Sequence, residues 1–296
     1  MNHKAGFVNI IGNPNVGKST LMNTLVGEKL SIITQKAQTT RHRIMGIVNG
    51  VDYQIVYSDL PGILKPAYML QRSMMKYVNT AVTDADMILY VTDVAESGKP
   101  GEFNNETFQK IKEVNVPVFL VLNKVDLSSQ EEVETLAARW KIILPGAEIF
   151  PVSALHNFNL DNLFKRIIEL LPESPPYFDK EDLTDKPVRF FICEIIREKI
   201  LRNYQKEIPY SVEVTLEEFS ETEKLVKMRS VIYVERESQK GIIIGHKGES
   251  LKKVGTSARI DIESFLGKKV FLEMYVKVDK DWRNNERRLT KYGYES

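Results

Sequence analysis

Short runs of apolar, often β-branched residues alternate with longer stretches of helical periodicity over residues 6–171. Six runs have the length of strands, at residues 7–11, 43–48, 53–57, 87–91, 118–122 and 148–152. Their nearly continuous apolar character is typical of strands covered by helices on both faces. Only the second and third runs are joined by a short polar turn, which indicates an antiparallel hairpin. The pattern therefore predicts an α/β fold with a mixed, mostly parallel sheet.

A proline-rich, acidic segment ends this pattern at residues 171–187. Beyond it the apolar periodicity changes to the order α-β-β-α-α-β, with strands expected at 210–216, 226–235 and 269–278 and long helices at 190–204 and 250–265. We therefore expect a first domain over residues 1–172, a linker over 173–187, and a second, α+β domain with a C-terminal helix over 188–296.

Composition narrows the class of protein. The chain has 296 residues, the length of about two domains, and its 43% apolar and 27% charged residues exclude collagen-like, coiled-coil and largely disordered chains. The single cysteine, Cys193, leaves no internal disulfide. No apolar run reaches the ~18 residues of a membrane span, and the N-terminus lacks a signal-peptide core. We expect a cytoplasmic protein, with peripheral membrane contact left open.

The first strand is followed directly by GNPNVGKS at residues 12–19, a G-x-x-x-x-G-K-S phosphate loop. Its glycines allow backbone N–H groups to converge on phosphate oxygens, and the next helix adds its positive N-terminus. Lys18 would reach the β- and γ-phosphates, and the Ser19 hydroxyl would ligate Mg²⁺. The predicted phosphate-binding residues are Gly12, Asn13, Asn15, Val16, Gly17, Lys18, Ser19 and Thr20.

The string NKVD at residues 123–126, after the fifth strand run, predicts guanine recognition. The Asp126 carboxylate can accept from the ring N–H and the exocyclic amine of guanine, a donor pair that adenine does not offer. Asn123 would tie this segment to the phosphate loop, and the Lys124 stem would cover a face of the base. The backbone N–H groups of Ser153 and Ala154 would meet the guanine carbonyl.

A third motif, DLPG at residues 59–62, ends the third strand run and adds Asp59, Leu60, Pro61 and Gly62 to the predicted GTP-binding set. Asp59 would hold Mg²⁺ through water, and the Gly62 N–H would face the γ-phosphate. Either Thr39 or Thr40, in the polar stretch before the second strand run, would complete the magnesium coordination. The predicted catalytic residues are Lys18, Thr39, Thr40 and Gly62.

These motifs stand in the order found in G domains, and residues 6–171 resemble the G domain of the translation-factor-like GTPases. The string QTTRHR at residues 38–43 is similar to the switch segment of the Era family. Ile63 stands where signalling GTPases carry a water-orienting glutamine, so we expect slow intrinsic hydrolysis. In related GTPases an asparagine matching Asn15 helps to bind potassium, which implies K⁺ beside Mg²⁺ as a cofactor.

The second domain carries a G-x-x-G turn, residues 245–248 (GHKG), ahead of the helix expected at 250–265. With the order α-β-β-α-α-β, this turn resembles a type II KH domain, which grips about four nucleotides of single-stranded RNA. A solvated helix face is the alternative explanation for the nearby lysines. The predicted RNA-binding residues are Lys240, Gly245, His246, Lys247, Gly248, Lys252 and Lys253.

A G domain followed by one KH domain resembles the Era family over essentially the whole chain. The resemblance implies a GTP/GDP switch that binds the 3′ region of 16S ribosomal RNA during assembly of the small ribosomal subunit. It also implies peripheral association with the inner face of the cell membrane, and we expect a monomer. Two alternatives stay open: a constitutive RNA-binding protein with an inert G domain, and a tRNA-modification-type GTPase.

Overall fold

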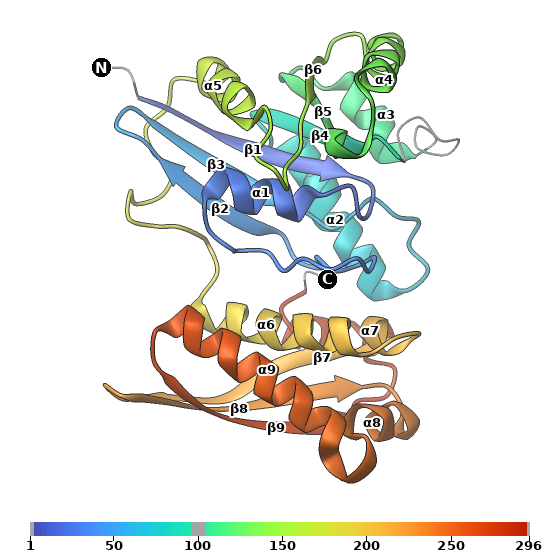
Figure 1. Ribbon diagram of the computed structural model, residues 1–296, viewed down its shortest axis with the longest axis vertical. Coiled ribbons are helices and arrows are strands. Elements are labelled where there is room, and N and C mark those ends of the chain that lie inside the picture. The colour runs from blue at the N-terminus through green and yellow to red at the C-terminus, as the bar shows by residue number, and fades with distance from the viewer. Residues whose placement is uncertain (1–2, 96–104, 295–296) are drawn as a thin grey trace. The chain divides into compact units, whose positions relative to one another are not determined.

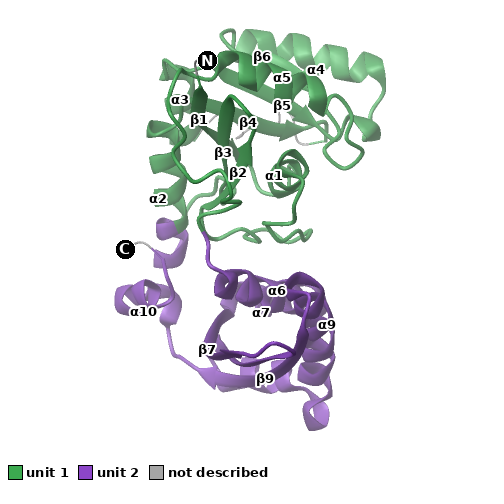
Figure 2. Ribbon diagram, turned by 90° about the vertical axis from the view of Figure 1, so that its left-hand side faces the viewer, with its two compact units in different colours: residues 1–66, 74–185 green, residues 67–73, 186–296 purple. Residues whose placement is uncertain are grey.

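The computed structural model of the chain describes residues 3–95 and 105–294 (Figure 1). The chain divides into two compact units. The first comprises residues 1–66 and 74–185, and the second comprises residues 67–73 and 186–296 (Figure 2). Each unit has its own sheet and its own apolar core.

The first unit is built on a six-stranded sheet with the order β2-β3-β1-β4-β5-β6. Neighbouring strands are parallel except β2, which pairs antiparallel with β3. The mixed sheet and its single reversed strand, both predicted from the apolar runs, are confirmed. The strands are β1 (Lys4–Gly12), β2 (Ile44–Asn49), β3 (Tyr53–Asp59), β4 (Met87–Asp93), β5 (Val118–Asn123) and β6 (Glu148–Pro151).

Helices cover both faces of this sheet, with α1 and α5 on one face and α2 and α3 on the other (Figure 1). Each residue of β4 is buried, because the strand lies inside the sheet between two layers of helices. The helices are α1 (Lys18–Val26), α2 (Met69–Thr83), α3 (Glu106–Glu113), α4 (Gln130–Ile143) and α5 (Leu160–Leu170). Among the described residues, no helix has the length and apolarity needed to cross a membrane.

Residues 173–185, the larger part of the expected linker, pack along the edge of the first sheet. The Ile47 N–H donates to the carbonyl oxygen of Leu183 at 2.9 Å, and the Met45 N–H donates to Asp185 Oδ1 at 3.0 Å. Both donors belong to β2, the edge strand. The segment therefore covers backbone groups that an exposed edge would offer to other chains.

The second unit contains a three-stranded sheet with the order β7-β8-β9, in which β7 and β8 are antiparallel and β8 and β9 are parallel. The element order agrees with the predicted α-β-β-α-α-β pattern. The elements are α6 (Val188–Asn203), α7 (Ile208–Ser211), β7 (Glu213–Glu221), β8 (Leu225–Val234), α8 (Glu237–Ile244), α9 (Glu249–Leu266), β9 (Lys269–Val278), η3 (Trp282–Asn284) and α10 (Glu286–Lys291).

One expected element of this unit is displaced. The sequence predicts a strand at 210–216, whereas residues 208–211 form the short helix α7 and the strand starts at Glu213. Pro209 explains the difference, because its fixed φ and missing N–H suit the first turn of a helix. The helices α6 and α9 then pack together through Ile192, Ile196 and Ile200 on one side and Val254, Ala258 and Ile262 on the other.

Candidate functional site

Three predicted motifs meet at the carboxyl edge of the first sheet. β1 ends at Gly12, β3 at Asp59 and β5 at Asn123. Because β1, β3, β4 and β5 all run parallel, their carboxyl ends lie along the same edge. Open α/β sheets bind their ligands at this edge. The fold thus brings together segments that are far apart in the sequence.

The phosphate loop requires glycine at two positions. Gly17 has a φ of +97°, a conformation that favours glycine, and a Cβ there would lie 2.2 Å from the side-chain nitrogen of Asn123. A Cβ on Gly12 would lie 2.1 Å from the carbonyl oxygen of Val91. Helix α1 begins at Lys18, so the first N–H groups of that helix have no helical acceptors. The loop and helix together form a cradle for phosphate oxygens.

The Lys18 ammonium is buried within the loop. Its Nζ donates to the carbonyl oxygens of Gly12 at 3.1 Å and Asn13 at 2.7 Å. Burial lowers the pKa of Lys18 to about 8, and the nearby Asp59 carboxylate opposes that shift. The charge is therefore held in a poorly solvated position, where an anionic phosphate would stabilise it.

Ser19, Thr40 and Asp59 converge beside this lysine. Ser19 Oγ donates to Asp59 Oδ2 at 2.7 Å, and Thr40 Oγ1 donates to the same oxygen at 3.1 Å. The two hydroxyl oxygens are 3.0 Å apart. The three side chains come from α1, from the segment before β2 and from the end of β3, so the fold assembles them from separate motifs.

The Asp59 carboxylate is suited to a cation. Its side chain is completely buried, and Oδ1 accepts no hydrogen bond within residues 3–95 and 105–294. Burial raises the pKa of Asp59, although the Ser19 hydrogen bond and the Lys18 charge oppose the shift. A buried carboxylate oxygen without a donor, beside two hydroxyl oxygens, fits a hard divalent cation such as Mg²⁺.

Thr39 lies in a different environment from Thr40. Its Oγ1 donates to the carbonyl oxygen of Lys36 at 2.6 Å and lies 2.6 Å from the hydroxyl oxygen of Thr34. The sequence left open which threonine completes the magnesium site. The structure brings Thr40 to Ser19 and Asp59, whereas Thr39 stabilises its own loop.

Gly62 packs directly against the phosphate loop. A Cβ at this position would lie 2.7 Å from the backbone nitrogen and Cα of Pro14. The N–H of the next residue, Ile63, donates to the carbonyl oxygen of Gly12 at 3.1 Å. Leu60 and Pro61 are buried. The backbone of Gly62, whose N–H is predicted to face the γ-phosphate, therefore lies against the phosphate loop. Only glycine permits so close an approach.

Asn123 joins the predicted base-recognition segment to two other motifs. Its Nδ2 donates to the carbonyl oxygen of Val16 at 2.9 Å, and its Oδ1 accepts from the Ala154 N–H at 3.0 Å. The side chain is buried, so water does not compete for these bonds. The first contact is the tie to the phosphate loop that the sequence predicted. The second, to the Ser153–Ala154 segment, was not predicted.

Lys124 spans the distance between a strand end and the phosphate loop. Its Nζ donates to the carbonyl oxygen of Asn15 at 2.7 Å and forms an ion pair with Asp93 at 2.5 Å. Asp93 is the buried last residue of β4, and it belongs to none of the predicted motifs. An aspartate at the carboxyl end of an apolar strand is the signal that would have found it.

Asp126 keeps its carboxylate accessible. Its side chain is 26% exposed, and His156 Nε2 lies 3.8 Å from Oδ2. The His156 N–H also donates to Ser153 Oγ at 3.3 Å, which orders the turn after Ala154. The predicted base acceptor is thus available to a ligand, and its neighbour His156 is not among the residues predicted from the sequence.

The predicted RNA-binding turn lies between α8 and α9 in the second unit. Gly245, Lys247 and Gly248 have positive φ values of 72°, 48° and 82°. A Cβ on Gly245 would lie 2.2 Å from the hydroxyl oxygen of Ser250, so this position requires glycine. Lys247 is exposed, as are His246, Lys252 and Lys253, whereas Lys240 is half-buried with its Nζ 3.9 Å from Glu237 Oε2.

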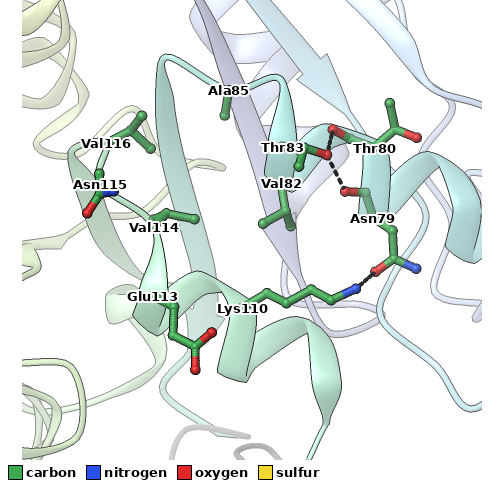
Figure 3. Close-up of a pocket in the computed structure, with 10 residues that line it drawn as sticks. All are labelled: Asn79, Thr80, Val82, Thr83, Ala85, Lys110, Glu113, Val114, Asn115 and Val116. Carbon is green, nitrogen blue, oxygen red and sulfur yellow. Dashed lines mark hydrogen bonds between the residues drawn. The ribbon is translucent and has the colours of Figure 1, made fainter.

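A separate hollow of about 590 Å³ lies at the opposite edge of the first sheet (Figure 3). It is formed by the end of α2, the end of α3 and the residues just before β4 and β5. Lys110 Nζ donates to Asn79 Oδ1 at 3.2 Å in this hollow. None of the predicted site residues lines it, so the predicted chemistry belongs to the carboxyl edge.

Two different protein families match the two parts of the chain. Residues 7–124 match a family model described as a 50S ribosome-binding GTPase, and residues 207–283 match a KH domain model. A GTPase Era from Alkaliphilus metalliredigens is 43% identical over 297 residues, covering 100% of both chains. A GTPase Era from Geobacter metallireducens is 45% identical over 293 residues, covering 98% of each.

Two solved structures match nearly the whole chain at 40% identity. One is a crystal structure of Era in complex with MgGDPNP and nucleotides 1506–1542 of 16S ribosomal RNA, with a TM-score of 0.95 and coverage of 99% of this chain and 100% of that chain. The other is an Aquifex aeolicus Era variant bound to GDP and AlF₄⁻, with a TM-score of 0.94 and the same coverage.

Proposed function

This chain belongs to the Era family of GTPases, and from that premise we propose that GTP controls its binding of small-subunit ribosomal RNA during assembly of that subunit. One observation carries the proposal: the contact of Ser19 and Thr40 with the buried Asp59 carboxylate. Such an arrangement suits a magnesium-bound triphosphate, and Thr40 lies in the segment that resembles a switch. Loss of the γ-phosphate would release that segment.

The chain is a GTPase, converting GTP and water to GDP and phosphate. Different residues of the site are proposed to bind the phosphates, the base and the metal ion. The phosphate loop N–H groups and the Lys18 ammonium bind the phosphates, while Asp126 reads the guanine edge. Ser19, Thr40 and Asp59 would hold Mg²⁺, directly or through water, and the ion supplies neutralisation of charge on the phosphate oxygens when bound. Gly62 places a backbone N–H at the γ-phosphate.

Hydrolysis without a partner is expected to be slow. Ile63 follows Gly62, is 8% exposed and has no hydrogen-bonding side chain to orient a water molecule. We further propose that K⁺ bound near Asn15 assists the reaction. The support is the left-handed backbone of Asn15, with a φ of 65°, at the centre of the phosphate loop. Single-turnover rates that are equal in sodium and potassium would contradict this role.

The KH unit is proposed to hold the RNA. The support is the exposed turn at residues 245–248, followed by the N-terminus of α9, with Lys252 and Lys253 exposed in that helix's first two turns. The similar Era structure contains nucleotides 1506–1542 of 16S ribosomal RNA, and we propose that the 3′ region of the same molecule is the target here.

The test is RNA affinity of the full chain in two nucleotide states. A fluorescent oligonucleotide from the 3′ end of the small-subunit RNA is titrated with protein in Mg·GDP or Mg·GDPNP. We expect tighter binding with GDPNP, by about 5- to 150-fold for a coupling of about 1–3 kcal/mol. Lys247→Glu should weaken binding in both states, whereas Lys227→Glu, an exposed lysine of β8, is the matched control.

Equal affinity in GDP and GDPNP would favour the alternative of a constitutive RNA-binding protein. A preference for transfer RNA over the ribosomal oligonucleotide would favour a tRNA-modification-type GTPase. We also propose that the protein is a cytoplasmic monomer with peripheral contact at the inner face of the cell membrane. Cell fractionation and light scattering of the purified chain test these two points.

A further inference from the structure

Asn23 of α1 holds the first part of the segment that joins α1 to β2 (Figure 1). Its Oδ1 accepts hydrogen bonds from the N–H groups of Leu30 at 3.0 Å and Ser31 at 2.9 Å. Its Nδ2 donates to the carbonyl oxygen of Ser31 at 2.7 Å. The amide therefore binds both the donor and the acceptor of the Ser31 backbone, as a neighbouring strand would.

The turn between Asn23 and Ser31 is fixed by further contacts. Gly27 ends α1 in the left-handed conformation, with a φ of +82°, and its N–H donates to the carbonyl oxygen of Asn23 at 2.9 Å. The side chains of Leu30 and Ile32, on either side of Ser31 in the sequence, are buried. Ser31 is therefore held at a defined position before the polar stretch that carries Thr40 begins.

This anchor lies on the side of α1 that faces the proposed magnesium site. Asn23 follows Ser19 by four residues, and residues at this spacing share a helix face. The Ser31 side chain is 1% exposed. Burial raises the pKa of the Asp59 carboxyl, and the Ser31 hydroxyl is one of the neighbours that oppose this rise, as Ser19 is. The Ser31 hydroxyl thus belongs to the surroundings of the Asp59 carboxylate.

Two buried polar atoms at this place have unused hydrogen-bonding capacity. Within residues 3–95 and 105–294, no hydrogen bond of ordinary geometry ends at Ser31 Oγ or at Asp59 Oδ1. Leaving such atoms unsatisfied is costly, so a polar group that reaches both would be stabilised there. Both atoms can accept a hydrogen bond, and a water molecule can donate two. Mg²⁺ in proteins usually keeps several of its waters.

We propose that Ser31 Oγ and Asp59 Oδ1 together bind one water of a hydrated magnesium ion, and that Asn23 is the positioning residue that keeps Ser31 in place. The inference rests on the magnesium site proposed above, to which it adds a hydroxyl that none of the predicted motifs contains. Asn23, Ser31 and Asp59 all belong to the first unit, so the contacts that carry the inference lie within one compact body.

The anchor also separates Ser31 from Thr40 in the nucleotide cycle. The proposed release of the switch segment after loss of the γ-phosphate would remove Thr40 from the ion. Ser31 is bound to α1 through Asn23, and these hydrogen bonds do not involve the nucleotide. Ser31 should therefore contribute to magnesium binding in the GDP state as well, where its effect can be measured without that of Thr40.

The test is the release of a fluorescent GDP from the full chain, chased with excess GDP, in EDTA and at increasing free Mg²⁺. The Mg²⁺ concentration that gives half of the full slowing of release measures the affinity for the ion. Ser31→Ala and Asn23→Ala should each raise this concentration about three- to tenfold, as expected for one lost hydrogen bond. In EDTA their release rates should stay within about twofold of wild type, because the hydroxyl acts only through the ion.

The double variant distinguishes positioning from a general structural role. If Asn23 acts through Ser31, the double variant should shift the Mg²⁺ concentration no further than the larger single shift. Additive shifts would overturn the role of Asn23, and so would faster release of GDP from Asn23→Ala in EDTA. If Asn23→Ala fails to fold, Asn23→Ser, which keeps a smaller polar group there, takes its place in the same comparison.

Ser230→Ala is the matched control for Ser31→Ala. Ser230 of β8 is completely buried, and its hydroxyl likewise makes no hydrogen bond among the described residues. Asn162→Ala, at an exposed asparagine of α5, is the control for Asn23→Ala. Both controls should keep the wild-type Mg²⁺ concentration. An unshifted concentration in Ser31→Ala would overturn the inference alone, whereas wild-type release that does not respond to Mg²⁺ would contradict the proposed magnesium site itself.

Discussion

The side-chain amide of Asn123 donates to the carbonyl oxygen of Val16 at 2.9 Å, and this contact joins the base-recognition segment to the phosphate loop. The same amide accepts from Ala154 and leaves no room for a Cβ at Gly17. Three motifs are thus held in one geometry by one buried side chain. A guanine and its phosphates can be bound together only if these motifs keep their spacing.

Asn123→Ala is expected to reduce both stability and nucleotide affinity. It leaves the Val16 carbonyl and the Ala154 N–H without their partner in a buried position, a cost of about 2 kcal/mol in the free energy of unfolding. Because the motifs lose their spacing, the Kd for GDP should rise at least about tenfold. Urea denaturation and titration with fluorescent GDP measure the two effects.

Asn162→Ala is the control for this substitution. Asn162 is an exposed residue of α5 whose side chain donates to Asn159 at 2.8 Å. Its loss should change the free energy of unfolding by no more than about 0.5 kcal/mol. Equal effects of the two substitutions would mean that the Asn123 contacts contribute no more to the free energy of unfolding than the exposed Asn162 contact does.

The fold was predictable where the chemistry is local. The runs 87–91 and 118–122 are nearly continuous apolar segments, and they form the buried strands β4 and β5. The failure at 210–216 has a local cause as well: the alternation of apolar residues outweighed Pro209, whose ring favours a helix start. A period of two is therefore a weaker signal than a proline at the beginning of the run.

The candidate site was predictable as a set of motifs but not as a set of contacts. Fixed spacing identifies the phosphate loop, since its glycines and Lys18 act within a few residues. The choice between Thr39 and Thr40 depends on Asp59, which is distant in sequence. The Lys124–Asp93 ion pair likewise depends on two neighbouring strands, because Lys124 directly follows β5 and Asp93 is the last residue of β4. Contacts of this kind follow from the order of strands in the sheet, which spacing along one chain does not contain.

Thr40→Ala and Thr39→Ala should differ in their magnesium dependence. Thr40 is hydrogen-bonded to Asp59, and its loss should raise the magnesium concentration needed for half-maximal hydrolysis by at least about tenfold. Thr39 bonds instead to its own loop, so Thr39→Ala should shift that concentration by less than about threefold. Magnesium titrations of the hydrolysis rate decide the point. The reverse order of effects would assign the magnesium contact to Thr39.

Asp126→Asn should shift the base preference of the site from guanine toward xanthine. The carboxylate accepts from two guanine N–H donors, whereas an amide donates to the second carbonyl oxygen that xanthine carries. We expect the variant to bind GDP at least about a hundredfold more weakly, as a lost pair of charge-assisted hydrogen bonds implies. Competition between GDP and XDP measures the exchange, with the exposed Asp161→Asn as control. Unchanged GDP binding would show that Asp126 does not read the base.

The pH dependence of stability should reveal the buried Lys18 ammonium in the nucleotide-free chain. Burial lowers its pKa from 10.5 to about 8, so the cost of holding the charge is complete below pH 8 and vanishes above pH 10.5. The wild-type chain should therefore gain stability relative to Lys18→Met as the pH rises from 8 to 10.5. The gain has an upper bound of about 3.5 kcal/mol, since one pKa unit is worth about 1.4 kcal/mol. Urea denaturation in magnesium-free buffer measures it, and Lys141→Met, at an exposed lysine, should give no such trend. A constant difference between wild type and Lys18→Met across this range would show that the ammonium is well solvated, and the argument that a phosphate stabilises it would fail.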